Sequence, residues 1–267
     1  MKKVVTENDE ILNNGFYLND RGEFVNIDVH ETLFSTHYSP EDLESMLYNS
    51  QEYPTLTAEI SVTDLKSGEA TRLLATNDTV PAVLNFASAK NPGGGYKRGS
   101  VAQEEDLCRC STLYYGLLNN SEFYKINRES GSHLYTDHII YSPNVLFFRD
   151  EYYNLLEQTA KVAVITSPAP NVGAMKKKVS NIKDVLLRRV GMILALAEHS
   201  EHSSLVLGAW GCGIFKNDPE MIADCFNYWL KGPRFCGAFD KVVFAIFEKN
   251  HTKPILNVFK RILCCKD

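Results

Sequence analysis

From residue 58 onward, short apolar runs alternate with longer segments in which apolar residues recur at helical spacing. Continuous apolar runs of this length are typical of strands buried on both faces, and the segments between them are typical of covering helices. The predicted strands are Ala58–Val62, Ala82–Phe86, His138–Phe147, Val162–Thr166, Leu205–Ala209 and Val242–Phe247. The predicted helices are Ser67–Ala75, Val101–Asn119, Ser180–His199, Pro219–Lys231 and Pro254–Cys264. This alternation predicts an α/β fold, with helices covering both faces of a mostly parallel or mixed sheet.

Residues 1–55 lack this alternation and are polar and irregular. Their one predicted helix is Pro40–Tyr48, where Glu41 and Asp42 suit a first helical turn. A chain of 267 residues can bury one large core with a small accessory segment. We therefore expect residues 1–55 to be an N-terminal extension packed on one domain that spans residues 56–267.

The composition narrows the class of protein. Hydrophobic residues make up 44% of the chain and charged residues 23%, as in an ordinary globular protein. The net charge of −5 argues against general nucleic-acid binding, although backbone amides bind small anions whatever the net charge. No apolar run approaches membrane-spanning length, and the N-terminus turns acidic where a signal peptide has its apolar core. We expect an intracellular, cytoplasmic protein, or a nuclear one in a eukaryote, that works as a monomer without membrane contact.

The cysteines agree with a reducing compartment. There are seven, an odd number, and Cys225 and Cys236 lie in apolar surroundings, as reduced core thiols commonly do. Cys108 and Cys110, like the adjacent pair at 264–265, lack the CxxC spacing and nearby histidines of a zinc site. We predict neither a metal site nor a disulfide.

Three strand ends carry the candidate chemistry. The first is the triplet Gly93-Gly94-Gly95, which follows the apolar run 81–87. Three successive glycines increase the entropy lost on folding, so a short loop that keeps them needs a reason, such as close backbone approach to a ligand. A flexible turn is the simpler interpretation, but the position just past a buried strand favours ligand contact.

The second strand end is the glycine-spaced loop 208–215, where Asn217 or Asp218 can cap the helix that starts at Pro219. A strand, a glycine loop and a helix N-terminus together favour phosphate binding, although the spacing matches neither a Walker nor a Rossmann motif. Phe215 is either a platform for a ribose or base, or a hydrophobic latch onto the helix.

The third is Gln103-Glu104-Glu105, at the start of a predicted helix. Adjacent helical residues point roughly 100° apart, so we expect the two carboxylates not to share one proton. One acts as an acid while the other binds a hydroxyl. Acidic residues are also common at helix N-termini, where the helix dipole stabilises them, but the nearby glycine triplet favours a functional role.

Together these motifs resemble the signature of the poly(ADP-ribose) glycohydrolases: Gly-Gly-Gly, a short spacer and Gln-Glu-Glu. The sequence of residues 83–95 is similar to that of the microbial-type branch. Further similarities at 140–145, 164–171 and 208–215 occur in the same order as in the family. The resemblance covers roughly residues 56–250. It implies a three-layer α/β/α macrodomain-like sandwich around a mixed sheet, so that residues 56–267 form the catalytic domain and no cofactor is needed.

The resemblance also implies roles for particular residues. Glu105 corresponds to the catalytic acid, and Glu104 to the glutamate that holds a ribose hydroxyl. The implied substrate-binding residues are Asn85, Gly93, Gly94, Gly95, Gln103, Gly211, Cys212, Gly213, Ile214 and Phe215, with Phe215 against the distal ribose and its loop on the diphosphate. Asp64 and Phe247 are either adenine-pocket or structural residues. Lys216 departs from the family, which often has glycine there.

The implied activity is cleavage of ribose–ribose O-glycosidic bonds in poly(ADP-ribose), with release of ADP-ribose. Glu105 would protonate the departing oxygen and then activate water as a base. The alternatives are a macrodomain that binds ADP-ribose without cleaving it, and a hydrolase of mono-ADP-ribosyl linkages on protein or nucleic acid. A nucleotide-dependent transferase or phosphatase is disfavoured by the lack of a clustered Asp/His metal set.

Overall fold

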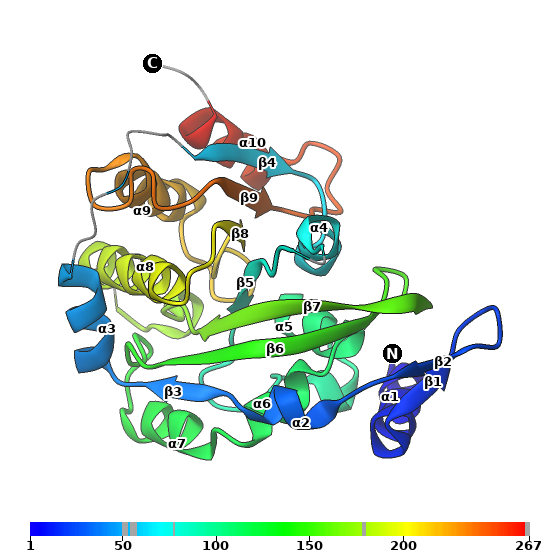
Figure 1. The fold of residues 1–267 in the computed structure, drawn as a ribbon. Coiled ribbons are helices and arrows are strands. Elements are labelled where there is room, and N and C mark those ends of the chain that lie inside the picture. The colour runs from blue at the N-terminus through cyan, green and yellow to red at the C-terminus, as the bar shows by residue number, and fades with distance from the viewer. Residues whose placement is uncertain (50–52, 54–57, 77, 178–179, 265–267) are drawn as a thin grey trace.

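A seven-stranded mixed sheet forms the centre of the protein in the computed structural model, which describes residues 1–49, 53, 58–76, 78–177 and 180–264 (Figure 1). In sheet order the strands are β3 (Thr36–Tyr38), β6 (Ile139–Arg149), β7 (Leu155–Ser167), β5 (Ala82–Phe86), β8 (Ser204–Leu207), β9 (Lys241–Ala245) and β4 (Glu59–Thr63). Neighbours from β7 to β4 are parallel, whereas β3, β6 and β7 pair antiparallel. The six predicted strands are therefore confirmed, with shifts at their ends.

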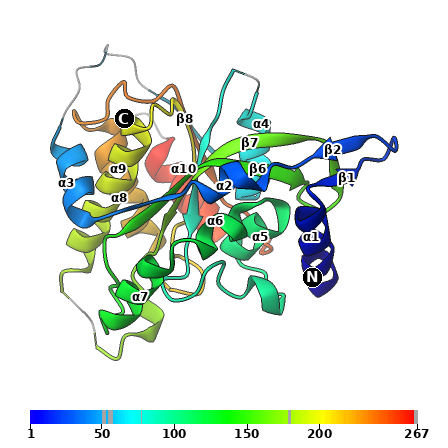
Figure 2. The ribbon, with the colours of Figure 1, turned by 60° about the horizontal axis from the view of Figure 1, so that its bottom comes forward.

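Helices cover both faces of the sheet. One layer contains α3 (Pro40–Tyr48), α8 (Ile182–His199), α9 (Pro219–Lys231) and α10 (Pro254–Leu263); the other contains α4 (Ser67–Leu74), α5 (Gln103–Cys110), α6 (Leu113–Leu118) and α7 (Ser121–Glu129). Figure 2 shows α3, α8 and α9 on one side of the sheet and α5 and α6 on the other. Successive strand residues face opposite ways, so Leu84 joins the core under α8 while Val83 joins the core under α5. The α/β/α sandwich is confirmed.

The N-terminal segment is more regular than its sequence predicts. It forms α1 (Lys2–Asn14), the hairpin β1 (Phe16–Leu18) and β2 (Phe24–Asn26), α2 (Val29–Leu33), and the edge strand β3. Helix α1 escapes notice because its buried face includes a polar residue, Asn8, whose Nδ2 donates to the Arg109 carbonyl. Strand β3 takes its register from Ile139–Tyr141 of β6, a partner that is distant in sequence. A domain boundary at residue 55 remains a prediction.

The predicted helix Val101–Asn119 is wrong as one unit, because the chain breaks it into α5 and α6. Ser111 has extended backbone angles and forms a bridge with Phe147 of β6. Next to it, Thr112 Oγ1 accepts the Leu146 N–H. Helix α7 and the short 3₁₀ turns Tyr96–Arg98 and Val172–Ala174 were also not predicted.

In the part of the chain that the structure describes, none of the helices combines the length and the apolar character needed to cross a membrane. The six cysteines that the structure describes are all free thiols.

Candidate active site

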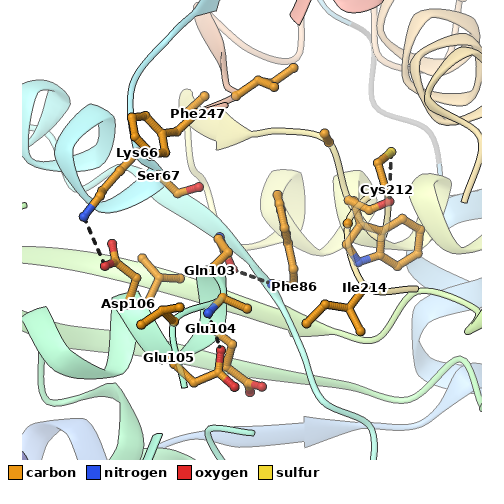
Figure 3. Close-up of a pocket in the computed structure, with 18 of the residues that line it drawn as sticks. Lys66, Ser67, Phe86, Gln103, Glu104, Glu105, Asp106, Cys212, Ile214 and Phe247 are labelled. Atoms are coloured by element: carbon orange, nitrogen blue, oxygen red, sulfur yellow. Dashed lines mark hydrogen bonds and ion pairs between the residues drawn. The ribbon is translucent and has the colours of Figure 1, made fainter. Parts of the chain in front are cut away.

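A cavity of about 650 Å³ opens at the carboxyl ends of the parallel strands. Its walls come from the residues after β4, the end of β5, the start of α5, the loop after β8 and the end of β9 (Figure 3). Ligands of open α/β sheets bind at this edge, where strand ends and helix N-termini meet. Glu104, Glu105 and loop 211–215 all line the cavity, so the structure brings two of the three predicted strand-end motifs together.

Glu105 is held by one backbone donor on each carboxylate oxygen. The Gly95 N–H donates to Oε1 at 2.7 Å, and the Ala102 N–H donates to Oε2 at 3.0 Å. The second contact is half of a capping arrangement, because Glu105 is the third residue of α5 and reaches back to the residue before the helix. Only 7% of Glu105 is exposed. Its carboxylate therefore has a fixed orientation beside the cavity.

Glu104 lies deeper than Glu105. Its Oε2 accepts the Ser88 N–H at 2.7 Å, and its Oε1 accepts from Asn85 Nδ2 at 3.3 Å. Burial raises the pKa of Glu104 to about 8; the hydrogen bonds from Ser88 and Asn85 act in the opposite direction, and the charge of Glu105 adds to the rise. The raised pKa favours the protonated form of Glu104, the form that can donate a hydrogen bond.

The side-chain amides of Asn85 and Gln103 are hydrogen-bonded within the protein, to Glu104 and to the backbone of β5. Asn85 is fully buried on β5 and is not part of the cavity wall; its Nδ2 also donates to Thr166 Oγ1. Gln103 lines the cavity, but its amide is occupied by the backbone of β5: Oε1 accepts the Phe86 N–H and Nε2 donates to the Leu84 carbonyl, both at 2.8 Å. This double contact fixes the start of α5 against the strand.

The glycine triplet lies behind the carboxylates and is not part of the cavity wall. Gly94 has a φ of +56°, and a Cβ there would lie 2.6 Å from Glu105 Oε1 and 3.0 Å from Glu104 Oε2. A Cβ on Gly93 would meet the Tyr114 ring at 2.7 Å, and one on Gly95 would meet Ser100 Oγ at 2.1 Å. The structure thus shows close backbone approach to the two acids, while contact of the triplet with a ligand remains a prediction.

Both glutamates consequently face the same point above Gly94. The two side chains leave the helix about 100° apart, as expected for adjacent residues. Rotation about the side-chain bonds nevertheless brings the carboxyl groups together. The interaction between the two acids contributes to the raised pKa of Glu104.

Loop 211–215 forms the opposite wall. Gly211 has a φ of +74°, and a Cβ there would lie 2.5 Å from Ala169 and from Asn217 Nδ2. Gly213 and Ile214 are exposed at the cavity. Cys212 is half-buried, and desolvation raises the pKa of its thiol to about 12. Of the two predicted caps, Asp218 caps α9 through the Glu220 N–H.

Asn217 instead holds the loop in place. Its Nδ2 donates to the Pro170 carbonyl at 2.7 Å and to the Gly211 carbonyl at 3.1 Å. Phe215 is half-buried: it packs against the larger core, and its ring centroid lies 6.0 Å from that of Tyr135. Lys216 has a φ of +55°, a left-handed backbone conformation that glycine adopts easily and lysine rarely.

The two residues predicted near adenine differ in their placement. Phe247 is half exposed and lines the cavity. Asp64 is not part of the wall. The hydrogen bond that it accepts from Lys253 Nζ, and secondarily their ion pair at 2.7 Å, lower the pKa of Asp64. Asp64 therefore has a structural contact of its own.

Sequence reasoning missed one wall of the cavity, formed by Lys66, Asp106 and Tyr153. Tyr153 Oη donates to Asp106 Oδ1 at 2.5 Å, and Lys66 Nζ lies 3.3 Å from the same oxygen. These residues come from the start of α4, from α5 and from the β6–β7 turn, so no local pattern links them. The one available signal was Asp106, which directly follows the two glutamates.

In the part of the chain that the structure describes, no group of three or more His, Cys, Asp or Glu side chains is placed to hold a metal ion. The donors that converge at the cavity are carboxyl groups and backbone amides. Paired carboxyl groups are the catalytic groups of most glycosidases, and here they lie in the strand-end cavity of a macrodomain-like α/β/α sandwich.

Comparison with known proteins identifies the family. The sequence model described as the catalytic domain of microbial-type PARG matches residues 6–150. The crystal structure of poly(ADP-ribose) glycohydrolase from Thermomonospora curvata is 40% identical, with 98% of each chain covered and a TM-score of 0.93. The same enzyme bound to the inhibitor ADP-HPD is 41% identical over 97% of this chain and 98% of that chain, with a TM-score of 0.90.

The Deinococcus radiodurans enzyme in complex with ADP-ribose is 39% identical over 88% of this chain and 96% of that chain, with a TM-score of 0.83. A search of curated protein sequences gave no match. The chain belongs to the family of microbial-type poly(ADP-ribose) glycohydrolase catalytic domains.

Proposed function

We propose that this protein hydrolyses the ribose–ribose O-glycosidic bonds of poly(ADP-ribose) and releases ADP-ribose, with Glu105 as the general acid and base. The observation that supports this most strongly is the fixed orientation of Glu105 beside the cavity, with backbone donors on both oxygens. The family and the relatives crystallised with ADP-ribose and with ADP-HPD support the substrate class.

Cleavage of a glycosidic bond develops positive charge on the anomeric carbon and needs a proton on the departing oxygen. In the proposal Glu105 gives this proton and then takes one from the attacking water. Glu104, whose raised pKa favours the protonated form, donates a hydrogen bond to a ribose hydroxyl. It thus binds the sugar without placing a full negative charge beside the residue that gives the proton.

We propose two different roles for the remaining predicted site residues. Gly211, Cys212, Gly213, Ile214 and Phe215 line the cavity and are proposed to bind the diphosphate and distal ribose. Asn85, Gln103 and the triplet 93–95 are proposed to position the two carboxyl groups, because their contacts go to these groups and to β5. We also propose that the protein works as a monomer.

Product analysis tests the function. The protein should convert poly(ADP-ribose) to ADP-ribose in the presence of a chelator, and Glu105→Gln should not. Mono-ADP-ribosylated protein, assayed in parallel, separates polymer cleavage from removal of single units. Saturable binding of ADP-ribose with no release from either substrate would support the non-hydrolytic alternative instead.

A further inference from the structure

The end of β7 and residues 168–171 after it hold both ends of loop 211–215. Before the loop, Trp210 Nε1 donates to the last carbonyl of β7 at 3.0 Å. After the loop, Asn217 Nδ2 donates to the Pro170 carbonyl at 2.7 Å. Both donor residues are buried, so these hydrogen bonds are stronger than they would be in water. The position of the loop at the cavity therefore depends on where residues 168–171 lie.

Arg189 of α8 in turn holds the segment after β7. Its Nη1 donates to the Pro168 carbonyl at 2.7 Å, and its Nη2 donates to the Leu134 carbonyl at 3.1 Å. Its Nε donates to Asp137 Oδ1 at 2.7 Å, and only 1% of the residue is exposed. Because the guanidinium is planar and rigid, it fixes the segment after β7 relative to the segment before β6.

The segment before β6, residues 134–137, also reaches the loop. The ring centroid of Tyr135 lies 6.0 Å from that of Phe215. Tyr135 has a φ of +58°, a strained conformation that persists only where surrounding contacts hold the backbone. Arg189 provides two of these contacts, at the carbonyl just before Tyr135 and at the carboxylate two residues after it. Through this segment Arg189 also influences the position of Phe215.

Neutralising Asp137 does not require Arg189. Arg188 binds the other carboxylate oxygen, Oδ2, through Nε at 2.8 Å and through Nη2. A buried ion pair adds little to stability, because the cost of desolvating the charges offsets much of their attraction. What Arg189 adds is a pair of hydrogen bonds to backbone carbonyls of two separate segments, and both segments contact the loop. These contacts indicate a role in positioning.

We propose that Arg189 is a positioning residue for loop 211–215, which it holds in the geometry that fits the diphosphate and the distal ribose. The inference rests on the proposed function, in which this loop binds those groups. Arg189 is buried and is not part of the cavity wall, so its effect on the ligand is indirect. Without the guanidinium, residues 168–171 and 134–137 can shift, and the loop shifts with them.

Calorimetry of ADP-ribose binding tests the inference. Arg189→Met removes both hydrogen bonds to the carbonyls and should weaken binding by about 10-fold or more, since a displacement of about 1 Å in positioning groups can cost roughly 10²-fold. Arg189→Lys keeps a positive charge beside Asp137 but lacks the rigid fork, so the loss should be smaller, roughly 3- to 10-fold. If Arg189→Met does not fold, Arg189→Lys decides the question.

Arg234 provides the matched control. Its side chain is also mostly buried, and it binds the carboxylate of Glu198 and the backbone carbonyls of Leu47 and Met46. None of these groups belongs to the two segments that hold the loop. Arg234→Met and Arg234→Lys should lower the melting temperature, but ADP-ribose affinity should change less than about twofold. An equal loss of affinity in the Arg234 variants would attribute the effect to general destabilisation and overturn the inference.

A double-mutant cycle tests the route from Arg189 to the loop. Asn217→Ala removes the contact between the loop and Pro170, so combining it with Arg189→Lys should weaken ADP-ribose binding by less than the product of the two separate losses. Fully independent losses would overturn the inference, as would unchanged affinity in the Arg189 variants. Absence of ADP-ribose binding by the unmodified protein is a separate result, which would refute the proposed function itself.

Discussion

The carboxylate of Glu105 closes directly over the backbone of Gly94. Its Oε1 accepts the N–H of the next residue, Gly95, at 2.7 Å, and a Cβ on Gly94 would stand 2.6 Å from that oxygen. The glycine is therefore a steric requirement for the position of the acid. Two kinds of variant, at the acid and at the glycine, can test this relationship.

Glu105→Gln should lower kcat by about 10²–10⁴-fold, because an amide cannot give a carboxylic proton. It should also be less stable by about 1–3 kcal/mol, since an amide has one acceptor oxygen and leaves either the Gly95 or the Ala102 N–H unpaired. Rate assays on polymer and thermal melts measure the two effects. Exposed Glu122→Gln serves as the control. Turnover within a few-fold of the unmodified protein would remove Glu105 from the role of acid.

Gly94→Ala should abolish most activity by displacing the Glu105 carboxylate, in addition to straining the backbone at a φ of +56°. Gly131→Ala separates the two effects, because Gly131 has a φ of +62° but no atom within 4 Å of the point where a Cβ would stand. Each substitution should lower the free energy of unfolding by about 1–2 kcal/mol through strain. Only Gly94→Ala should also lower kcat; equal activities for the two variants would contradict the steric argument.

Glu104 should make the protein less stable as pH rises. Its pKa increases from 4.5 to about 8 on folding, so between about pH 5 and 8 the folded protein keeps a proton that the unfolded chain releases. Stability is fully present below this window and falls by about 1.4 kcal/mol per pH unit within it. Denaturant unfolding of the unmodified protein and Glu104→Gln should therefore diverge in this range, with the variant losing less stability. Parallel pH profiles would show that Glu104 is ionised in the folded protein.

Phe215→Ala should raise KM and lower kcat together, through lost positioning of the distal ribose. Because the ring is only half-buried, the cost in stability should fall below the roughly 3–5 kcal/mol of a fully buried phenylalanine. Fully buried Phe226→Ala provides that reference. Thermal melts with and without ADP-ribose decide between platform and latch: a variant that melts early but is stabilised normally by ADP-ribose has lost a latch only.

Lys216→Gly should stabilise the protein by up to about 1 kcal/mol. Glycine removes the strain of a φ of +55°, and its greater freedom in the unfolded chain offsets part of the gain. Lys216→Ala is the control, since it removes the same side chain but keeps the strain. If chemical denaturation shows both variants equally stable, the side chain rather than the backbone determines the effect.

Much of the fold follows from local pattern. The runs at 82–86 and 242–247 are apolar enough to be strands whatever surrounds them, and Pro219 and Pro254 mark helix starts that the structure confirms. The break between α5 and α6 is different, because it depends on Ser111 pairing with Phe147. Helix α1 is hidden for a related reason, since its buried Asn8 is satisfied by Arg109, 101 residues away.

The sequence by itself determined the family, the α/β/α class and the identity of the candidate acids, because these depend on residue type and spacing along the chain. Only the tertiary structure decided how these residues act. It directs the glycine triplet toward Glu105 and turns the Gln103 amide to the backbone of β5. It also buries Glu104 deeply enough to raise its pKa to about 8. Hydrogen bonds and desolvation depend on which groups meet in space, and contacts between segments separated along the chain leave no local pattern in the sequence.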